Sequence, residues 1–218
     1  MIECDETRGH MYARVSNVKL AEFNCSSNSI ADEFDNLTDE KDPSGQEMFI
    51  YFFKVMQRRI FYTESRKQHL KLYDMDNKQT ICTADFNIWP QLIALSPCAN
   101  YVAVLEDKKI MLGNIIVDPT NEGKAKIEVI RQKDQINEEF PVHVRFARFG
   151  NKGLRIITTS PDMCCAISDI DLEHKEYFHP QKGNKLHEHW VTITEWHEPL
   201  GMLVTYGQDQ TFSMVLWD

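Results

Sequence analysis

Four segments of the chain share one plan, and this internal repeat constrains the fold more than any other feature of the sequence. Each segment runs through an apolar strand, a turn, a second apolar strand, a tight polar turn and a third strand. The third strands end in a small or aromatic residue followed by Asp74, Asn114, Asp169 or Asp218. Units of about 40 to 45 residues with four strands each are typical of propeller blades. The repeat therefore predicts an all-β array of similar units.

The second unit, QLIALSPCANYVAVLEDKKIMLGN at residues 91–114, shows the plan in full. Ser96-Pro97 leads into an apolar strand, Asp107 lies at a tight turn, and Gly113-Asn114 ends the third strand. This order and spacing resemble a repeat of the WD-repeat β-propeller family, with Gly-Asn in the place of Trp-Asp. Each blade of such an array buries its apolar faces only against neighbouring blades. The resemblance therefore implies stacked four-stranded sheets.

The third and fourth units resemble the same family in part. Asp162 and Ser168-Asp169 keep the spacing of the second unit, and the fourth unit closes on Trp217-Asp218. Asp209, however, stands eight residues before that tryptophan instead of six, which predicts a bulge or a different turn. His189 lies near the place of the His that the family bonds to its turn Asp.

These units predict about four blades, at residues 48–86, 91–133, 141–180 and 187–218. The fourth unit ends after its third strand. Either a predicted N-terminal strand at residues 11–23 supplies the fourth strand and closes a ring, or another chain or further sequence supplies it. We therefore expect either a closed propeller or an incomplete one.

The N-terminal part, residues 1–47, differs from the repeats. Its second half, residues 23–47, is rich in Asp and Glu with Ser, Asn, Pro and Gly between them, which predicts a flexible segment. The following residues, 48–60, fit two structures. A capping-box pattern at Ser44 and Glu47 favours a helix, whereas the aromatic run in IYFF fits a buried strand. The repeat that follows favours the strand.

Charge and composition narrow the class of protein. The net charge of −9 disfavours a phosphate backbone as the main partner. The first residues, MIECDETRGH, lack the basic and then apolar order of a signal peptide, and we find no apolar run long enough to span a membrane. We therefore expect an intracellular protein, cytoplasmic or nuclear, with its six scattered cysteines reduced.

Candidate chemical motifs have simpler structural explanations. Asp74-Met75-Asp76 and Asp169-Ile170-Asp171 are possible cation ligands, but both stand where a third strand ends. His187-Glu188-His189 and His197 suit a transition metal, yet no third ligand follows at a fixed spacing. Nucleophile-elbow and phosphate-loop motifs are absent from the sequence. We expect no cofactor, no metal and no enzymatic activity; a propeller hydrolase is the less favoured alternative.

The favoured function is a non-catalytic scaffold that binds protein partners. The resemblance implies contacts from the turns between second and third strands and from the loops entering first strands. Carried onto this chain, these are Arg66, Lys67, Trp89, Asp107, Lys108, Lys109, Asp162, Met163, His189, Trp190, Asp209 and Gln210.

The alternative is an RNA-associated subunit. The segment QRRIFYTESRKQHLK at residues 57–71 interleaves aromatic residues with a basic patch of Arg58, Arg59, Arg66, Lys67 and Lys71. A solvated blade edge, whose lysines prevent edge pairing, explains the same residues. A linked hypothesis is that the acidic segment 32–47 folds over this patch and competes with acidic partners.

Overall fold

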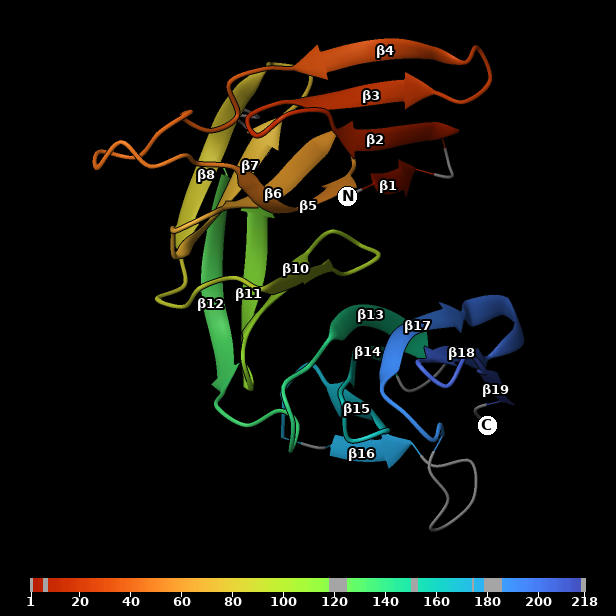
Figure 1. Ribbon diagram of the computed structural model, residues 1–218. Coiled ribbons are helices and arrows are strands. Elements are labelled where there is room, and N and C mark those ends of the chain that lie inside the picture. The colour runs from red at the N-terminus through yellow and green to blue at the C-terminus, as the bar shows by residue number, and fades with distance from the viewer. Residues whose placement is uncertain are drawn as a thin grey trace. The chain divides into compact units, whose positions relative to one another are not determined.

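The computed structural model describes residues 2–5, 8–117, 125–149, 153–173, 175–178 and 186–216 (Figure 1). The Trp217-Asp218 ending of the fourth repeat lies outside the described residues. Five antiparallel sheets make up the described chain, and in each of them strands that follow one another in sequence pair side by side. The prediction of an all-β, blade-like array is confirmed.

The strands of the first two sheets lie in the N-terminal half. The first sheet contains β1 (Ile2–Asp5), β2 (His10–Arg14), β3 (Leu20–Asn24) and β4 (Ser29–Phe34). The second contains β5 (Ile50–Met56), β6 (Arg59–Glu64), β7 (His69–Asp74) and β8 (Gln79–Asp85).

The other three sheets follow along the chain. The third contains β9 (Leu92–Leu95), β10 (Tyr101–Glu106), β11 (Lys109–Val117) and β12 (Ala125–Lys133). The fourth contains β13 (His143–Phe149), β14 (Gly153–Thr159), β15 (Cys165–Asp169) and β16 (Lys175–Phe178). The described part of the fifth contains β17 (Val191–His197), a 3-10 turn η2 (Glu198–Leu200), β18 (Met202–Gly207) and β19 (Phe212–Leu216).

The chain divides into two compact units. One comprises Met1–Gln91 with Ile115–Glu128, and the other comprises Leu92–Asn114 with Val129–Asp218. The boundaries between them run through strands β11 and β12. The first unit thus holds the first two sheets, and the second unit holds the fourth and fifth.

Sheet stacking explains the hydrophobic runs of the inner strands. In β6, the consecutive residues Ile60, Phe61 and Tyr62 are all buried, so both faces of the strand are covered. One apolar cluster joins Tyr12 and Leu20 of the first sheet to Ile60 and Tyr62 of the second. These sheets therefore bury their apolar faces against each other, as the repeat predicts.

The first sheet corrects the expectation for the N-terminus. The predicted single strand at 11–23 is two strands, β2 and β3, and β4 (Ser29–Phe34) occupies part of the segment that was predicted to be flexible. Leu20, Ala21 and Phe34 are buried and anchor these strands. The high density of acidic residues around them obscured these buried positions in the sequence pattern. The described chain therefore has five blades, where the repeat predicted about four.

Two further alternatives are settled by strand pairing. The residues predicted to complete the last blade, 11–23, pair within the first sheet, with Met11 opposite Phe23. Among the described strands, they form no pairs with the fifth sheet. The stretch that fits either a helix or a strand forms β5, because it pairs antiparallel with β6, with a register shift between Ile50 and Phe53.

Candidate functional site

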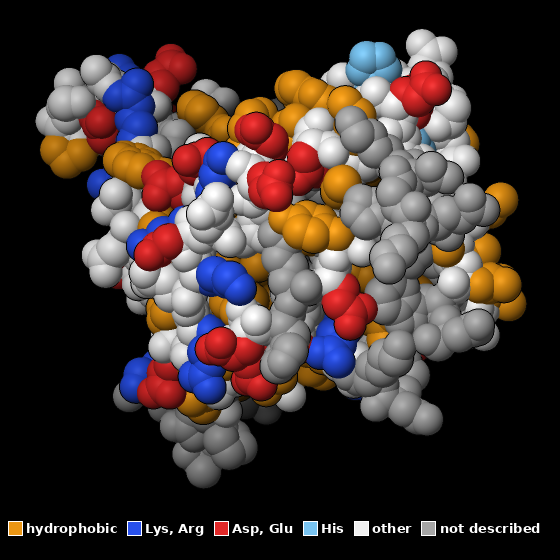
Figure 2. All heavy atoms as spheres, turned by 90° about the horizontal axis from the view of Figure 1, so that it is seen from below, with side chains coloured by type: hydrophobic (Ala, Val, Ile, Leu, Met, Phe, Trp, Pro, Cys, Tyr) orange, Lys and Arg blue, Asp and Glu red, His pale blue; other side chains and the backbone are white. Residues whose placement is uncertain are grey.

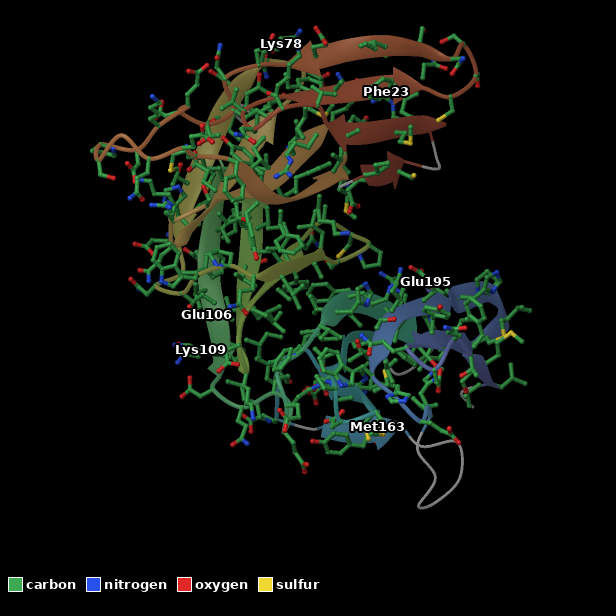
Figure 3. The ribbon with its side chains drawn as sticks, in the orientation of Figure 1. Phe23, Lys78, Glu106, Lys109, Met163 and Glu195 are labelled. Atoms are coloured by element: carbon green, nitrogen blue, oxygen red, sulfur yellow. The ribbon has the colours of Figure 1, made fainter. Side chains whose placement is uncertain are left out.

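In four of the five sheets, the turns between second and third strands share one backbone feature. Arg66, Asp107, Met163 and Gln210 each adopt a left-handed conformation, with φ of 64°, 49°, 65° and 63°. They lie between β6 and β7, β10 and β11, β14 and β15, and β18 and β19. In Figure 3, Glu106 and Lys109 flank the second of these turns and Met163 marks the third. The predicted partner-binding positions are therefore structurally equivalent from blade to blade.

The last of these turns is held by a buried polar group. His187 is almost fully buried, with its Nε2 2.8 Å from the Thr205 hydroxyl and its Nδ1 3.1 Å from an Asp209 carboxylate oxygen. The Glu188 amide donates to the same carboxylate. Desolvation alone would raise the pKa of Asp209, but hydrogen bonds from Thr211, Glu188 and His187 outweigh it and lower the pKa.

This geometry corrects the assignment of the repeat histidine. The spacing indicated His189, but His187 bonds the turn aspartate, and His189 is exposed. Residues two apart share one side of an extended chain, so spacing alone distinguishes them poorly. Gly207 leaves room for the ring, because a Cβ there would lie 2.6 Å from His187 Nδ1. That glycine is the signal that sequence reasoning missed.

The fourth sheet builds the same connection from different residues. Asn137, which is buried, donates to the Ser160 hydroxyl at 2.9 Å and accepts from the Thr158 hydroxyl at 2.8 Å. Ser160 in turn donates to the Asp162 carboxylate at 2.6 Å. Asn137 thus reaches the predicted turn residue through one hydroxyl. Its sequence context gave no indication of this role.

The remaining predicted residues of the second unit lie on exposed loops and turns. Lys108 donates to the Glu138 carbonyl, and Lys109 lies 3.9 Å from Asp134. Trp190 is exposed and its ring meets that of Phe140 edge-on at 6.0 Å between centroids. Lys108 and Lys109 are thus half-buried and have partners within the chain, and Trp190 is the exposed member of the three.

A pocket in the first unit brings together three other predicted residues. Arg66, Lys67 and Trp89 line a cavity of about 170 Å³, with six further residues: Phe49, Tyr51, Glu64, Ser65, Pro90 and Gln91. The Trp89 and Tyr51 side chains are 44% and 46% exposed. Exposed aromatic side chains beside a cavity are typical of protein-binding sites.

The pocket also contains a compensated carboxylate. Glu64 is buried and lies 2.7 Å from His69 and 3.0 Å from Lys71. Burial alone would raise the pKa of Glu64, but its hydrogen bonds with His69 and Lys71 outweigh burial and lower the pKa to about 2. The Lys71 ammonium group is therefore already paired with Glu64. Within the described chain, neither Arg66 nor Lys67 forms an ion pair, so both charges face solvent or a ligand.

The predicted basic patch is not one surface. Arg58 and Arg59 lie at the start of β6 and Arg66 and Lys67 beyond its end, about 20 Å away over six extended residues. Arg58 is paired with the buried Glu22 at 3.0 Å and with Asp76 at 2.9 Å. On the face drawn in Figure 2, basic side chains are interspersed with acidic ones. The arrangement does not favour an RNA-binding strip at residues 57–71.

The fifth sheet leaves one face uncovered. Phe212, Met214 and Leu216 alternate along β19 and are 71%, 69% and 69% exposed, and Ile193 of β17 is also exposed. The opposite face is covered, because Trp196 stacks on Phe149 of the fourth sheet with 3.9 Å between ring centroids. The sheet thus carries apolar side chains on both faces, as an inner blade does, but the described residues bury only one.

The metal candidates are structural in this fold. The Asp74 carboxylate accepts hydrogen bonds from the Asp76 and Asn77 amides, so this Asp-x-Asp closes a turn. His187 is buried against Asp209 while His189 is exposed. Over the described ranges, no group of three or more His, Cys, Asp or Glu side chains is placed to hold a metal ion.

Comparison with known proteins identifies the fold. No protein-family model and no curated protein matches the chain. By contrast, 1162 chains of solved structures match it, so the fold alone carries little functional information. A chain in the "Crystal Structure of Mitotic Checkpoint Complex" matches with a TM-score of 0.64 and 10% sequence identity. The match covers 95% of this chain but 56% of that one, so this chain spans just over half its length.

The fold and these surfaces define a class. The chain is a β-propeller-type protein of about five blades. None of the helices in the described chain has the length and apolar character needed to cross a membrane.

Proposed function

We propose that the chain is a non-catalytic, WD-repeat-like scaffold that binds protein partners within a larger intracellular complex. The repeat spacing and the bond between His187 and the turn residue Asp209 support the WD-like character. The similarity to a chain of a multi-protein checkpoint assembly is consistent with a role in a complex. The half-buried Lys108 in the turn between β10 and β11 and the exposed Trp190 in the loop before β17 supply further contacts.

The uncovered face of the fifth sheet is the observation that carries this proposal. Four large apolar side chains, Ile193, Phe212, Met214 and Leu216, are exposed on one sheet surface. Exposed apolar patches on soluble proteins mark sites of association. Tyr206 extends the patch, because its ring lies 4.8 Å from that of Phe212 between centroids. A partner that covers this face would bury it as the fourth sheet buries the opposite face.

The proposal is tested by capture from the native source with a face variant and a matched control. The variant carries Phe212→Ser and Met214→Lys. The control is Val129→Lys, which adds the same charge at another exposed apolar strand residue. We expect stoichiometric partners on the wild-type chain and the control, and their loss from the face variant, with nuclease treatment having no effect.

Two results would contradict the scaffold. Capture of the same proteins by the face variant would show that the face does not bind them. Partners that vanish after nuclease treatment, with steep salt dependence, would indicate nucleic acid instead. A substrate screen with and without chelator covers the hydrolase alternative, for which the scaffold predicts no turnover.

A further inference from the structure

We propose that the pocket lined by Phe49, Tyr51, Arg66, Lys67 and Trp89 is a second binding site, which takes an acidic peptide segment bearing one aromatic side chain. The site uses none of the residues of the uncovered face on the fifth sheet. It therefore goes beyond the proposed function, and its test is independent of that proposal.

The size and lining of the pocket indicate which side chain of the peptide it would hold, here called the anchor. A cavity of about 170 Å³ lies below the range of about 300 to 1,000 Å³ that is common for small-molecule sites, so it suits a single side chain. Phe49 and Tyr51 lie 6.2 Å apart between centroids with a tilt of 50°, and Trp89 lines the same cavity. Tilted aromatic rings at this separation favour contact with another aromatic ring.

The charge of the pocket indicates which residues of the peptide would flank the aromatic anchor. Arg66 and Lys67 lie on its wall, and Arg14 lies 5.9 Å from the Phe49 ring centroid. The single carboxylate of the lining, Glu64, is already compensated by His69 and Lys71. The net field at the pocket is therefore positive. A methylated lysine, which three aromatic rings would otherwise suit, is disfavoured by that field.

The Arg66 charge also acts on a carboxylate of the chain itself, that of Asp42. The Asp42 carboxylate accepts hydrogen bonds from the Ser44 hydroxyl and amide and from the Gln46 amide. These bonds, with a smaller contribution from the Arg66 guanidinium, lower the pKa of Asp42. A bridge between Lys41 and Glu47 closes this short loop. An acidic segment from a partner would meet Arg66 in competition with Asp42.

This arrangement refines the hypothesis that an acidic segment covers a basic patch. Residues 29–34 of the segment form β4 in the first sheet, and the loop at residues 41–47 holds Asp42, the acidic residue on which the Arg66 charge acts. A deletion of residues 25–46, the direct test of that hypothesis, would therefore also remove β4 from the first sheet. A single neutralising substitution, Asp42→Asn, removes the competing charge and leaves the loop its hydrogen-bonding oxygen.

The test is fluorescence anisotropy with a labelled synthetic peptide, Ac-DEDFEDE-NH2, and the full chain at low and at physiological ionic strength. Trp89→Ala should weaken binding about tenfold, since aromatic anchors dominate interfaces. Arg66→Glu should weaken it by a similar factor. Asp42→Asn should strengthen binding about two- to fivefold, the range for one exposed charge. The matched control is Arg59→Glu, an equal charge reversal at the far end of β6.

Two control peptides distinguish the contribution of the aromatic side chain to affinity from that of the acidic residues. The same peptide with Ala for Phe should bind about tenfold more weakly, and a Lys-rich peptide with the central Phe should not bind. Equal loss of affinity from Arg59→Glu and Arg66→Glu would overturn the site in favour of general electrostatics. So would binding that is indifferent to Trp89→Ala, or a preference for a trimethyl-lysine peptide.

Two further measurements keep the outcomes distinct. Thermal unfolding of each variant identifies a loss of affinity that comes from a loss of fold. The Phe212→Ser, Met214→Lys chain should bind the peptide as the wild type does. If that variant loses its captured partners but keeps the peptide, both proposals stand separately; if the peptide fails while capture succeeds, only the pocket proposal falls.

Discussion

The His187 imidazole and the Asp209 carboxylate lie 3.1 Å apart and connect the loop before β17 to the turn between β18 and β19. Both residues lie outside the strands, so the contact fixes a loop against a turn within one blade. The residues that complete it, Thr205 and Thr211, come from the same sheet. Stability of this blade therefore depends on a polar connection as well as on its apolar faces.

Gly207→Ala should destabilise this blade. The new Cβ would lie 2.6 Å from both His187 Nδ1 and Asp209 Oδ1, so the ring or the turn must shift. We expect a loss of about 1 to 3 kcal/mol, measured by urea unfolding. In a double-mutant cycle, His187→Ala should remove part of the added cost, since the ring is one of the two obstacles and Asp209 is the other. Additive losses would show that the ring and the glycine are not coupled.

Asn137→Leu should destabilise the fourth sheet by about 2 to 3 kcal/mol. The substitution keeps the volume but leaves the buried Thr158 hydroxyl without its acceptor and removes the amide donor to Ser160, which keeps its bond to Asp162. Chemical unfolding provides the measurement, and Gln132→Leu, at an exposed position of β12, is the control that should change stability little. A neutral Asn137→Leu would mean that another group satisfies these hydroxyls.

Glu64 should make stability depend on pH in the acid range. Its folded-state pKa is about 2, below the ordinary value near 4.3, so the folded state binds the proton less readily. The stabilisation is therefore complete above the ordinary pKa and is lost as the pH falls towards 2. It is on the order of 3 kcal/mol at neutral pH. Unfolding free energies of wild type and Glu64→Gln should differ at pH 7 and converge near pH 2; a constant difference would exclude this cause.

The two faces of the fifth sheet should respond differently to substitution. Met214→Lys on the uncovered face should reduce self-association and change stability by no more than about 0.5 kcal/mol. Trp196→Ala on the covered face should cost about 3 kcal/mol, because the ring stacks on Phe149 and donates to the Arg148 carbonyl. Sedimentation velocity and thermal unfolding measure the two effects. Similar losses from both substitutions would mean that both faces are covered in solution.

Much of the architecture could be predicted because the repeat records strand order. Asp107, Asp162 and Asp209 stand at turns between second and third strands, as their spacing indicated. The first sheet escaped prediction since its apolar positions, among them Tyr12 and Phe34, are scattered among charged residues that face solvent or form buried ion pairs. Burial of Glu22 beside His10, Tyr12 and Arg58 is one such case.

The site could be predicted only in part. Turn positions follow from the repeat, so Arg66, Lys67 and Trp89 were named, but their convergence on one pocket depends on how the loop before β9 meets the turn after β6. The aromatic run that contains Phe49 and Tyr51, the other aromatic residues of the pocket, fits a buried strand, so the sequence pattern indicates core residues at these two positions. Exposure of Phe212 and Met214 was equally invisible, because a strand's hydrophobic pattern does not say which face is covered.

The left-handed residues at Arg66, Asp107, Met163 and Gln210 bear on how this fold can change. Four unlike side chains occupy one backbone conformation, so the turn geometry is specified by the strands on either side rather than by the residue itself. Such positions accept a range of unbranched side chains, whereas β-branched residues would be strained at a positive φ. Binding preferences can therefore be rewritten turn by turn, by selection or by design, while the framework stays constant.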